Sequence, residues 1–464
     1  MKRTLSNWWV GHDRSSKALR VLLSSYASIG AQMVHTLAVF PMILTYCDVS
    51  TLGVWILVTQ FAMYAGILDA GITGASVRLM VGPLARKESG KTADLFRAAF
   101  IFSIAQGAVC AALALAAKPV ASMLGLSGTE ADIFHPLFSA QMLLSGLLFL
   151  VRPYGSVLLA SQRFEASNLA SASGTLIAIA LSYWGLSHGL GLWSVFWGTC
   201  LTQALAVAFG LAHAYRLQLV PFGWWSWDLA TPAHLARLGR ESLSFLAAPV
   251  SQTASGILQS LVLARFCGAE GVAIFNTGTK IASLGMMLIQ KFQDVLLVGF
   301  SELHELGRPA VFERRFRQGM ALLFTAWALA SLGISSLNSV FLAFWTSRRI
   351  SWPEELNWMI CGWLGAVLAS KYFANVFTVV LNRTGIRVVP ILDFASLTVC
   401  LGLFSLRPSL STFCLAIAVA PWASLAVFTL RHLKIFLSGY SFFCALLFLA
   451  GGIMLILFLG AFFS

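Results

Sequence analysis

The chain has 464 residues, of which 58% are hydrophobic and only 11% are charged, and its mean hydropathy is +0.81. The hydrophobic content and the mean hydropathy lie above those of soluble globular domains, and the charged fraction lies below. Together they indicate an integral membrane protein without a sizeable soluble domain. The formal net charge of +13 would suit a nucleic-acid-binding protein, but most Lys and Arg residues fall in loops on one predicted side of the membrane. Topology therefore explains the charge, and no nucleic-acid partner is expected.

Apolar windows of about 20 residues, the length that a spanning helix needs, follow one another along the whole chain. The predicted spans are 19–45, 52–80, 93–117, 134–160, 165–187, 190–217, 235–266, 271–300, 313–343, 355–383, 386–406, 409–434 and 438–463. The first run is too long for a signal peptide, and the basic segment before it predicts a cytoplasmic N-terminus. The last window makes the number of spans odd, which leaves both twelve and thirteen spans open.

The chain shows signs of two halves. Residues 218–234 are rich in Trp and Pro, as suits a linker lying along the headgroups. Stretches 41–58 and 260–277 both end a span, cross a short acidic turn and enter the next span at a Gly-Val step. Their offset of about 220 residues, or six spans, preserves orientation, as in parallel-repeat transporters. The sequence predicts an all-α polytopic membrane protein of two six-helix bundles related by a pseudo-two-fold axis along the membrane normal.

The predicted parts are an N-terminal six-helix lobe (1–217), a cytoplasmic interfacial linker (218–234), a C-terminal six-helix lobe (235–436) and a segment (437–464) that would add a transmembrane helix.

Three predicted spans each present a cation within a polar helical face. These faces comprise Gln141 and Arg152 in the fourth span, Asn276, Lys280, Lys291 and Asp294 in the eighth, and Lys371, Asn375 and Asn382 in the tenth. Charged residues inside spans usually face the bundle interior or a watery cavity. Cations at graded depths suit an anionic ligand that travels across the membrane, so the four cations are predicted to line a substrate path and the four amides a polar cavity.

Structural explanations of these cations remain open. Lys291 and Asp294 lie three residues apart and could form an internal ion pair. Arg152 could reach backbone carbonyl groups if Pro153 breaks its helix. No acid lies within one turn of Lys280 or Lys371 in the sequence, which favours a cavity-lining role for both.

Asp69 lies in "YAGILDAGITGASVRLM" (64–80), at the end of a long apolar run. On an unbroken helix it shares a face with small and hydroxyl-bearing residues such as Gly66, Thr73 and Ser76, whereas Arg78 points about 180° away. Asp69 must therefore meet a cation on another helix or stay protonated. A gate or ion-coupling role, shared with Asp294, and a role as a buried structural tie are equally open.

No enzyme signature is present in the sequence. It lacks a Gly-rich phosphate loop, an HExxH motif and a Ser nucleophile elbow, and its eight cysteines are scattered without a CxxC pair. We therefore expect no catalytic residues, no cofactor and no metal site.

Three stretches of the chain resemble a known family. Gly53-Val54-Trp55 after an acidic turn, then Tyr64, Leu68-Asp69-Ala70-Gly71 and Arg78, are similar to the opening of Wzx-type O-antigen and polysaccharide-unit flippases. "RPYGSVLLASQRFEASN" and "GAEGVAIFNTGTK" resemble two later motifs of that family, the second placing Lys280 at its basic position. The family belongs to the multidrug/oligosaccharidyl-lipid/polysaccharide exporter (MOP) superfamily. Ala70 departs from the larger apolar residue often found there.

The resemblance implies a flippase of the bacterial inner membrane that serves surface polysaccharide synthesis, including O-antigen lipopolysaccharide and exopolysaccharide. Such a protein moves an undecaprenyl-diphosphate-linked oligosaccharide from the cytoplasmic to the outer leaflet by alternating access. The implied partners are this lipid-linked oligosaccharide, membrane lipid, a coupling H⁺ or Na⁺, and polysaccharide polymerase machinery.

Two alternatives are weighed against the flippase. A cation-coupled multidrug exporter of the same superfamily should have a more acidic cavity than these four cations allow. A membrane glycan polymerase or ligase commonly needs a substantial outer loop, and the predicted outer loops are short.

Overall fold

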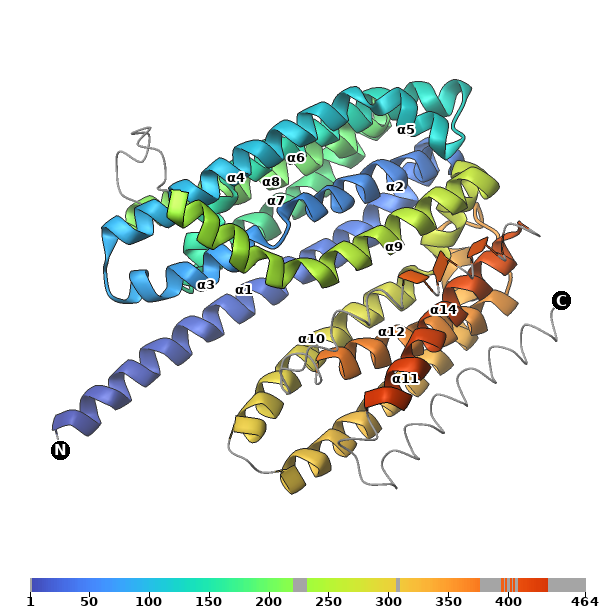
Figure 1. Ribbon diagram of the computed structural model, residues 1–464. Coiled ribbons are helices and arrows are strands. Elements are labelled where there is room, and N and C mark those ends of the chain that lie inside the picture. The colour runs from blue at the N-terminus through green and yellow to red at the C-terminus, as the bar shows by residue number, and fades with distance from the viewer. Residues whose placement is uncertain are drawn as a thin grey trace. The chain divides into compact units, whose positions relative to one another are not determined.

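The computed structural model of the protein describes residues 2–219, 232–305, 309–375 and 408–432, together with positions 394–395, 397–398, 401–402 and 404. Every regular element in these ranges is a helix (Figure 1). Eight of the described helices are long and apolar enough to cross a membrane. The predicted all-α class and the multi-pass membrane character are therefore confirmed.

The chain forms two compact helical units. One comprises Met1–Ser122 and Ser127–Val250, and the other comprises Met123–Leu126 and Ser251–Ser464. The boundary falls within the long helix α9 (Pro232–Gly278), because Leu238 near its start is buried in the core of the first unit. The predicted linker at 218–234 stays a prediction, since residues 220–231 lie outside the described part.

In the first unit, α6 is the central helix. The elements of this unit are, in chain order, α1 (Lys2–Tyr46), α2 (Val49–Tyr64), the 3-10 helix η1 (Ala65–Asp69), α3 (Ile72–Ala85), α4 (Ser89–Leu115), most of α5 (Ala117–Leu124), α6 (Gly128–Ala160), α7 (Glu165–Ser187), α8 (Leu192–Arg216) and the start of α9. Helix α6 packs against α2, α3, α4 and α8, while α7 packs against α1 and α8. A residue on α6 can thus meet partners from several helices.

Glycines bring α4 and α6 unusually close together. A Cβ atom added to Gly146 would lie 3.0 Å from the carbonyl oxygen of Gly107, and one added to Gly107 would lie 3.1 Å from the carbonyl oxygen of Gly146. Small residues permit this approach of two backbones within a membrane bundle. The contact fixes α6 against the part of α4 that carries Gln106.

The predicted span 52–80 is not one continuous helix. Helix α2 ends at Tyr64, η1 follows to Asp69, and Ala70 and Gly71 have φ angles of 48° and 75° before α3 begins. Gly71 adopts this left-handed conformation without steric cost, whereas Ala70 requires the surrounding structure to hold it. The predicted continuous helix from Gly66 to Ser76 is therefore wrong, although Thr73 does lie beside Asp69 as predicted.

Other bounds differ in smaller ways. Helix α7 has the predicted limits, but α1 begins at Lys2 rather than at residue 19, and the predicted outer loop 118–133 contains most of α5. Helix α6 continues through Pro153, so the suggested break that would turn Arg152 toward carbonyl groups does not occur. Proline removes only one backbone donor, and the other hydrogen bonds of a long, well-packed helix can maintain it.

In the second unit, α12 is central. The described helices are the end of α9, then α10 (Lys280–Glu305), α11 (Pro309–Trp345), α12 (Glu355–Asn375) and α14 (Leu410–His432). Helix α12 packs against α10, α11 and α14. Gly268, with φ 68°, interrupts α9 at the predicted outer turn between 266 and 271. Most of the predicted span 386–406 and all of 438–463 lie outside the described residues.

Candidate functional site

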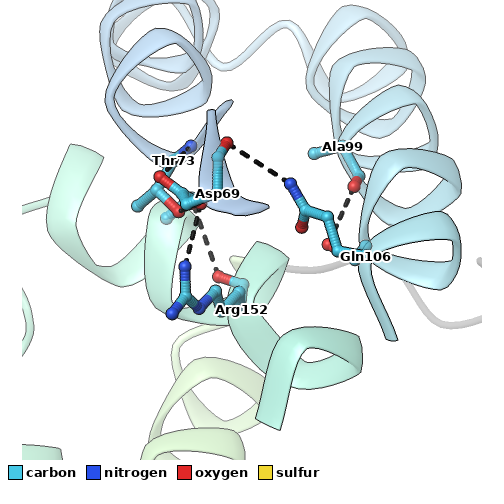
Figure 2. A network of polar contacts seen from close by, with 7 residues as sticks. Asp69, Thr73, Ala99, Gln106 and Arg152 are labelled. Atoms are coloured by element: carbon cyan, nitrogen blue, oxygen red, sulfur yellow. Dashed lines mark hydrogen bonds and ion pairs between the residues drawn. The ribbon is translucent and has the colours of Figure 1, made fainter. Parts of the chain in front are cut away.

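The helix break between α2 and α3 places Asp69 opposite α6. Arg152 projects from α6, and its Nη1 atom lies 3.0 Å from Oδ1 of Asp69 (Figure 2). The Asp69 side chain is 20% exposed and that of Arg152 is 37% exposed. The ion pair is therefore half-buried between two helices and still accessible from one side.

Asp69 also has partners in its own segment. Oγ1 of Thr73 donates a hydrogen bond to Oδ1 of Asp69 at 2.6 Å, and the Thr73 amide donates to Oδ2 at 3.4 Å. This carboxylate thus satisfies donors in the first turn of α3, where the helix dipole also favours a negative charge.

The backbone at the break is tied to α4. Nε2 of the buried Gln106 donates to the carbonyl oxygen of Asp69 at 3.3 Å (Figure 2). Ala70 is held in its left-handed conformation by a bond from its amide to the carbonyl oxygen of Ile67 at 3.0 Å. The position of Asp69 is therefore fixed by α4 even though the helix is interrupted there.

Arg152 is held by an aromatic ring as well as by Asp69. Its guanidinium carbon lies 4.0 Å from the centroid of the Phe149 ring, one turn earlier on α6. A cation over an aromatic face is stabilised, and the guanidinium carries five N–H donors. Nη1 faces Asp69, and 37% of the Arg152 side chain is exposed.

Arg78 has a different partner. Its Nη1 atom lies 3.4 Å from Oε2 of Glu241, on the first part of α9, and their side chains are 67% and 34% exposed. Arg78 therefore pairs with Glu241 and not with Asp69.

The loop between α3 and α4 contains an exposed charge cluster. Glu88 pairs with Lys91 at 3.0 Å and with Arg86 at 2.7 Å. Hydrogen bonds from Lys91 and then Arg86 lower the pKa of Glu88 below its ordinary value of 4.5. This acidic residue thus remains ionised at neutral pH in the most basic loop of the first unit.

Three other predicted site residues have described surroundings. Gln141 is buried on α6, and its Oε1 atom has no hydrogen-bond partner among the residues that the structure describes. Asn276 donates from Nδ2 to the carbonyl oxygen of Val272 at 2.9 Å within α9. Lys280 is the first residue of α10 and is half-buried.

The other predicted site residues lie partly or wholly outside the described structure. Lys291 and Asp294 lie on α10, and Lys371 and Asn375 lie on α12, but their side chains are outside the described part of the structure; Asn382 lies outside it altogether. The structure therefore brings Asp69 and Arg152 together, and the wider path of cations stays a prediction.

Two polar groups were not identified from sequence. Gln106 is not among the predicted site residues, although a lone amide within the apolar stretch "IFSIAQGAVC" indicates a buried polar contact in the same way as Gln141 does. In the second unit, Oδ1 of the buried Asn357 accepts from Nδ2 of Asn338 and from Nε1 of Trp352, each at 2.8 Å. Nδ2 of Asn338 also donates to the carbonyl oxygen of Gly278 at 3.1 Å. This network ties α11 and α12 to the end of α9.

Comparison with protein-family models and with curated proteins gives no match. Solved structures do match over nearly the whole chain. An inward-facing multidrug-resistance MATE transporter of the MOP superfamily has a TM-score of 0.72 at 12% identity, covering 96% of this chain and 99% of that one.

Two further structures share the fold. An inward-closed lipid II flippase, MurJ, has a TM-score of 0.66 at 12% identity, covering 95% of this chain and 98% of its own. A MOP-superfamily transporter from Pyrococcus furiosus, whose binding pocket is described as reversed in polarity with a suggested different function, has a TM-score of 0.58 at 13% identity over 96% of each chain. The chain thus has the fold of the MOP-superfamily transporters, and the similar structures named are transporters or a flippase rather than enzymes.

Proposed function

We propose that this protein flips a lipid-linked oligosaccharide, carried on undecaprenyl diphosphate, from the cytoplasmic to the outer leaflet of the bacterial inner membrane. The observation that carries this proposal is Arg152, a cation inside a spanning helix whose side chain is 37% exposed. A guanidinium can bind phosphate oxygens through two parallel hydrogen bonds, and a charge at this depth is normally functional.

The fold also supports the flippase proposal. Among the structures that share it are a lipid II flippase and a transporter described as having a binding pocket of reversed polarity. A cationic path of Arg152, Lys280, Lys291 and Lys371 would provide counter-charges for a diphosphate, while its lipid tail stays in the bilayer. In this proposal the N-terminus is cytoplasmic, a H⁺ or Na⁺ gradient drives the cycle, and polysaccharide polymerase machinery receives the glycan.

A multidrug exporter is the second candidate. It is favoured by the MATE transporter with a TM-score of 0.72 and by Asp69, a carboxylate inside the first unit that could bind a cationic drug. The two candidates differ in the charge of the substrate, so they can be separated directly.

Depletion of the protein in its own cells tests the choice. The flippase predicts that lipid-linked glycan accumulates on the cytoplasmic leaflet and that surface polysaccharide falls, with unchanged sensitivity to cationic drugs. Increased drug sensitivity with normal surface polysaccharide would contradict the flippase and favour the exporter.

A further inference from the structure

Arg152 has capacity for an anion beyond Asp69. The described ion pair uses Nη1, and the Phe149 ring supports the guanidinium from one side. More than a third of the side chain stays exposed. This exposed part of the Arg152 side chain is where a further anion would approach.

The Asp69 carboxylate keeps two hydrogen-bond donors when Arg152 leaves. The Thr73 hydroxyl lies 2.6 Å from Oδ1 and the Thr73 amide lies 3.4 Å from Oδ2. Both donors belong to the first turn of α3, whose dipole favours a carboxylate. Separation of the ion pair does not leave an unpartnered buried charge, which is the usual reason that such pairs are costly to break.

The backbone around Asp69 stays in place during such an exchange. The Gln106 side chain holds the Asp69 carbonyl oxygen from α4, and Ala70 and Gly71 separate α2 from α3. The Asp69 carboxylate can thus leave Arg152 through a small rotation of its side chain while it keeps the Thr73 donors that it already has.

We propose that Asp69 is a displaceable counter-ion, which holds Arg152 until the diphosphate of an incoming lipid-linked substrate replaces it. The freed carboxylate then stays on the first turn of α3, held by the two Thr73 donors. This inference rests on the proposed flippase function and adds a residue that tunes substrate affinity. A diphosphate carries more negative charge than one carboxylate and can engage two N–H donors at once, so it wins the competition for the guanidinium.

The test is binding of undecaprenyl diphosphate to the full chain in detergent. Asp69→Asn frees Arg152 and is expected to tighten binding about fivefold or more, because a larger fraction of the protein is then competent to bind. Thr73→Val removes the second partner of Asp69 and is expected to weaken binding about two- to threefold, because the carboxylate then stays with Arg152. General damage to the lobe would weaken binding in both variants, so opposite signs identify competition.

Glu241→Gln is the matched control. It makes the same acid-to-amide change at another inter-helix ion pair of the same unit, that with Arg78. Its affinity should stay within about twofold of the unmodified protein. An equal gain in Glu241→Gln would overturn the inference, because the gain would then reflect overall charge.

Arg152→Ala separates failure of the inference from failure of the function. If Arg152→Ala weakens binding but Asp69→Asn does not tighten it, Arg152 binds the headgroup without competition and the inference is wrong. If the unmodified protein and Arg152→Ala bind equally or not at all, both the inference and the proposed function are wrong.

Hydrogen exchange on the unmodified protein gives a second readout that needs no variant. Undecaprenyl diphosphate should slow exchange of the Thr73 amide several-fold, because the freed carboxylate binds it more closely. Unchanged or faster exchange of that amide at saturating lipid would overturn the inference even if Asp69→Asn failed to fold.

Discussion

The carboxylate of Asp69 and the guanidinium of Arg152 lie 3.0 Å apart across two elements of the first unit, at a point where the helix that carries Asp69 is interrupted. The pair joins the break between α2 and α3 to the central helix α6. Its stability and its chemistry both follow from its half-buried position.

Loss of the Asp69–Arg152 pair should destabilise the protein more than loss of the more exposed Arg78–Glu241 pair. Arg152→Ala leaves Asp69 with only its Thr73 donors and should lower the free energy of unfolding by about 1–2 kcal/mol, less than for a fully buried pair. Arg78→Ala, at a more exposed pair, should lower it by less than about 1 kcal/mol. Thermal melting of both variants in detergent measures the difference, and a reversed order would contradict the assigned burial.

The contact between α4 and α6 predicts opposite effects for two glycines of one helix. Gly146→Ala would place a Cβ 3.0 Å from the Gly107 carbonyl oxygen. A backbone atom of a packed helix gives way less easily than a flexible side chain, so about 1–3 kcal/mol of stability should be lost. Gly155→Ala meets only the Phe164 ring at 3.8 Å and should gain up to about 1 kcal/mol from helix propensity. Equal shifts in melting temperature would show that α4 and α6 are not in close contact.

The asparagine network predicts a large effect in the second unit. Asn357→Ala removes the acceptor of Asn338 and Trp352 and the donor to Ser339. Buried donors without partners should then cost about 2–4 kcal/mol. Ser336→Ala is the control, because this exposed hydroxyl bonds only a carbonyl of its own helix. The free energy of unfolding, measured with denaturant, should fall in Asn357→Ala and barely change in Ser336→Ala. Equal losses in the two variants would contradict the network.

The loop cluster around Glu88 predicts a defined pH dependence. The pKa of Glu88 is lower in the folded protein than its ordinary value of 4.5, so its ionised form stabilises the fold above that value. The contribution is lost as pH falls through the lowered pKa. The difference in melting temperature between the unmodified protein and Glu88→Gln should be the same at about pH 8 and pH 6 and should close only below about pH 4.5. Closure between pH 8 and pH 6 would contradict the pairing.

The all-α class and the approximate position of several helices could be predicted because long apolar windows and charged loops determine them. Helix α7 even has its predicted bounds. The predicted span 271–300 is an exception, since α9 ends at Gly278 and α10 begins at Lys280, so the polar face predicted from Asn276 to Asp294 is divided between two helices. The break at 65–71 could not be predicted, since Gly71 alone signals it and a left-handed φ is unusual for a residue such as Ala70. A helical-phase argument is valid only while the helix continues.

The candidate site was predictable in its residue types but not in its pairing. Asp69 and Arg152 stand out because charged residues are rare in spans. The prediction that Arg78 does not pair with Asp69 agrees with the structure, although its helical-phase argument crosses the break at Ala70 and Gly71. The choice among cations on other helices depends on how α6 packs beside α2 and α3. Gln106 contributes through a backbone contact with Asp69, which no side-chain pattern reveals.

Reconstitution tests the central claim most directly. The purified protein is placed in vesicles that carry a labelled undecaprenyl-diphosphate oligosaccharide on one leaflet, with and without a H⁺ or Na⁺ gradient, and a membrane-impermeant glycosidase reports which leaflet holds the label. The flippase account predicts transfer of the label between leaflets with the unmodified protein, and strongly reduced transfer with Arg152→Ala. A label that stays on its leaflet, while the same vesicles transport a cationic drug, would contradict the account.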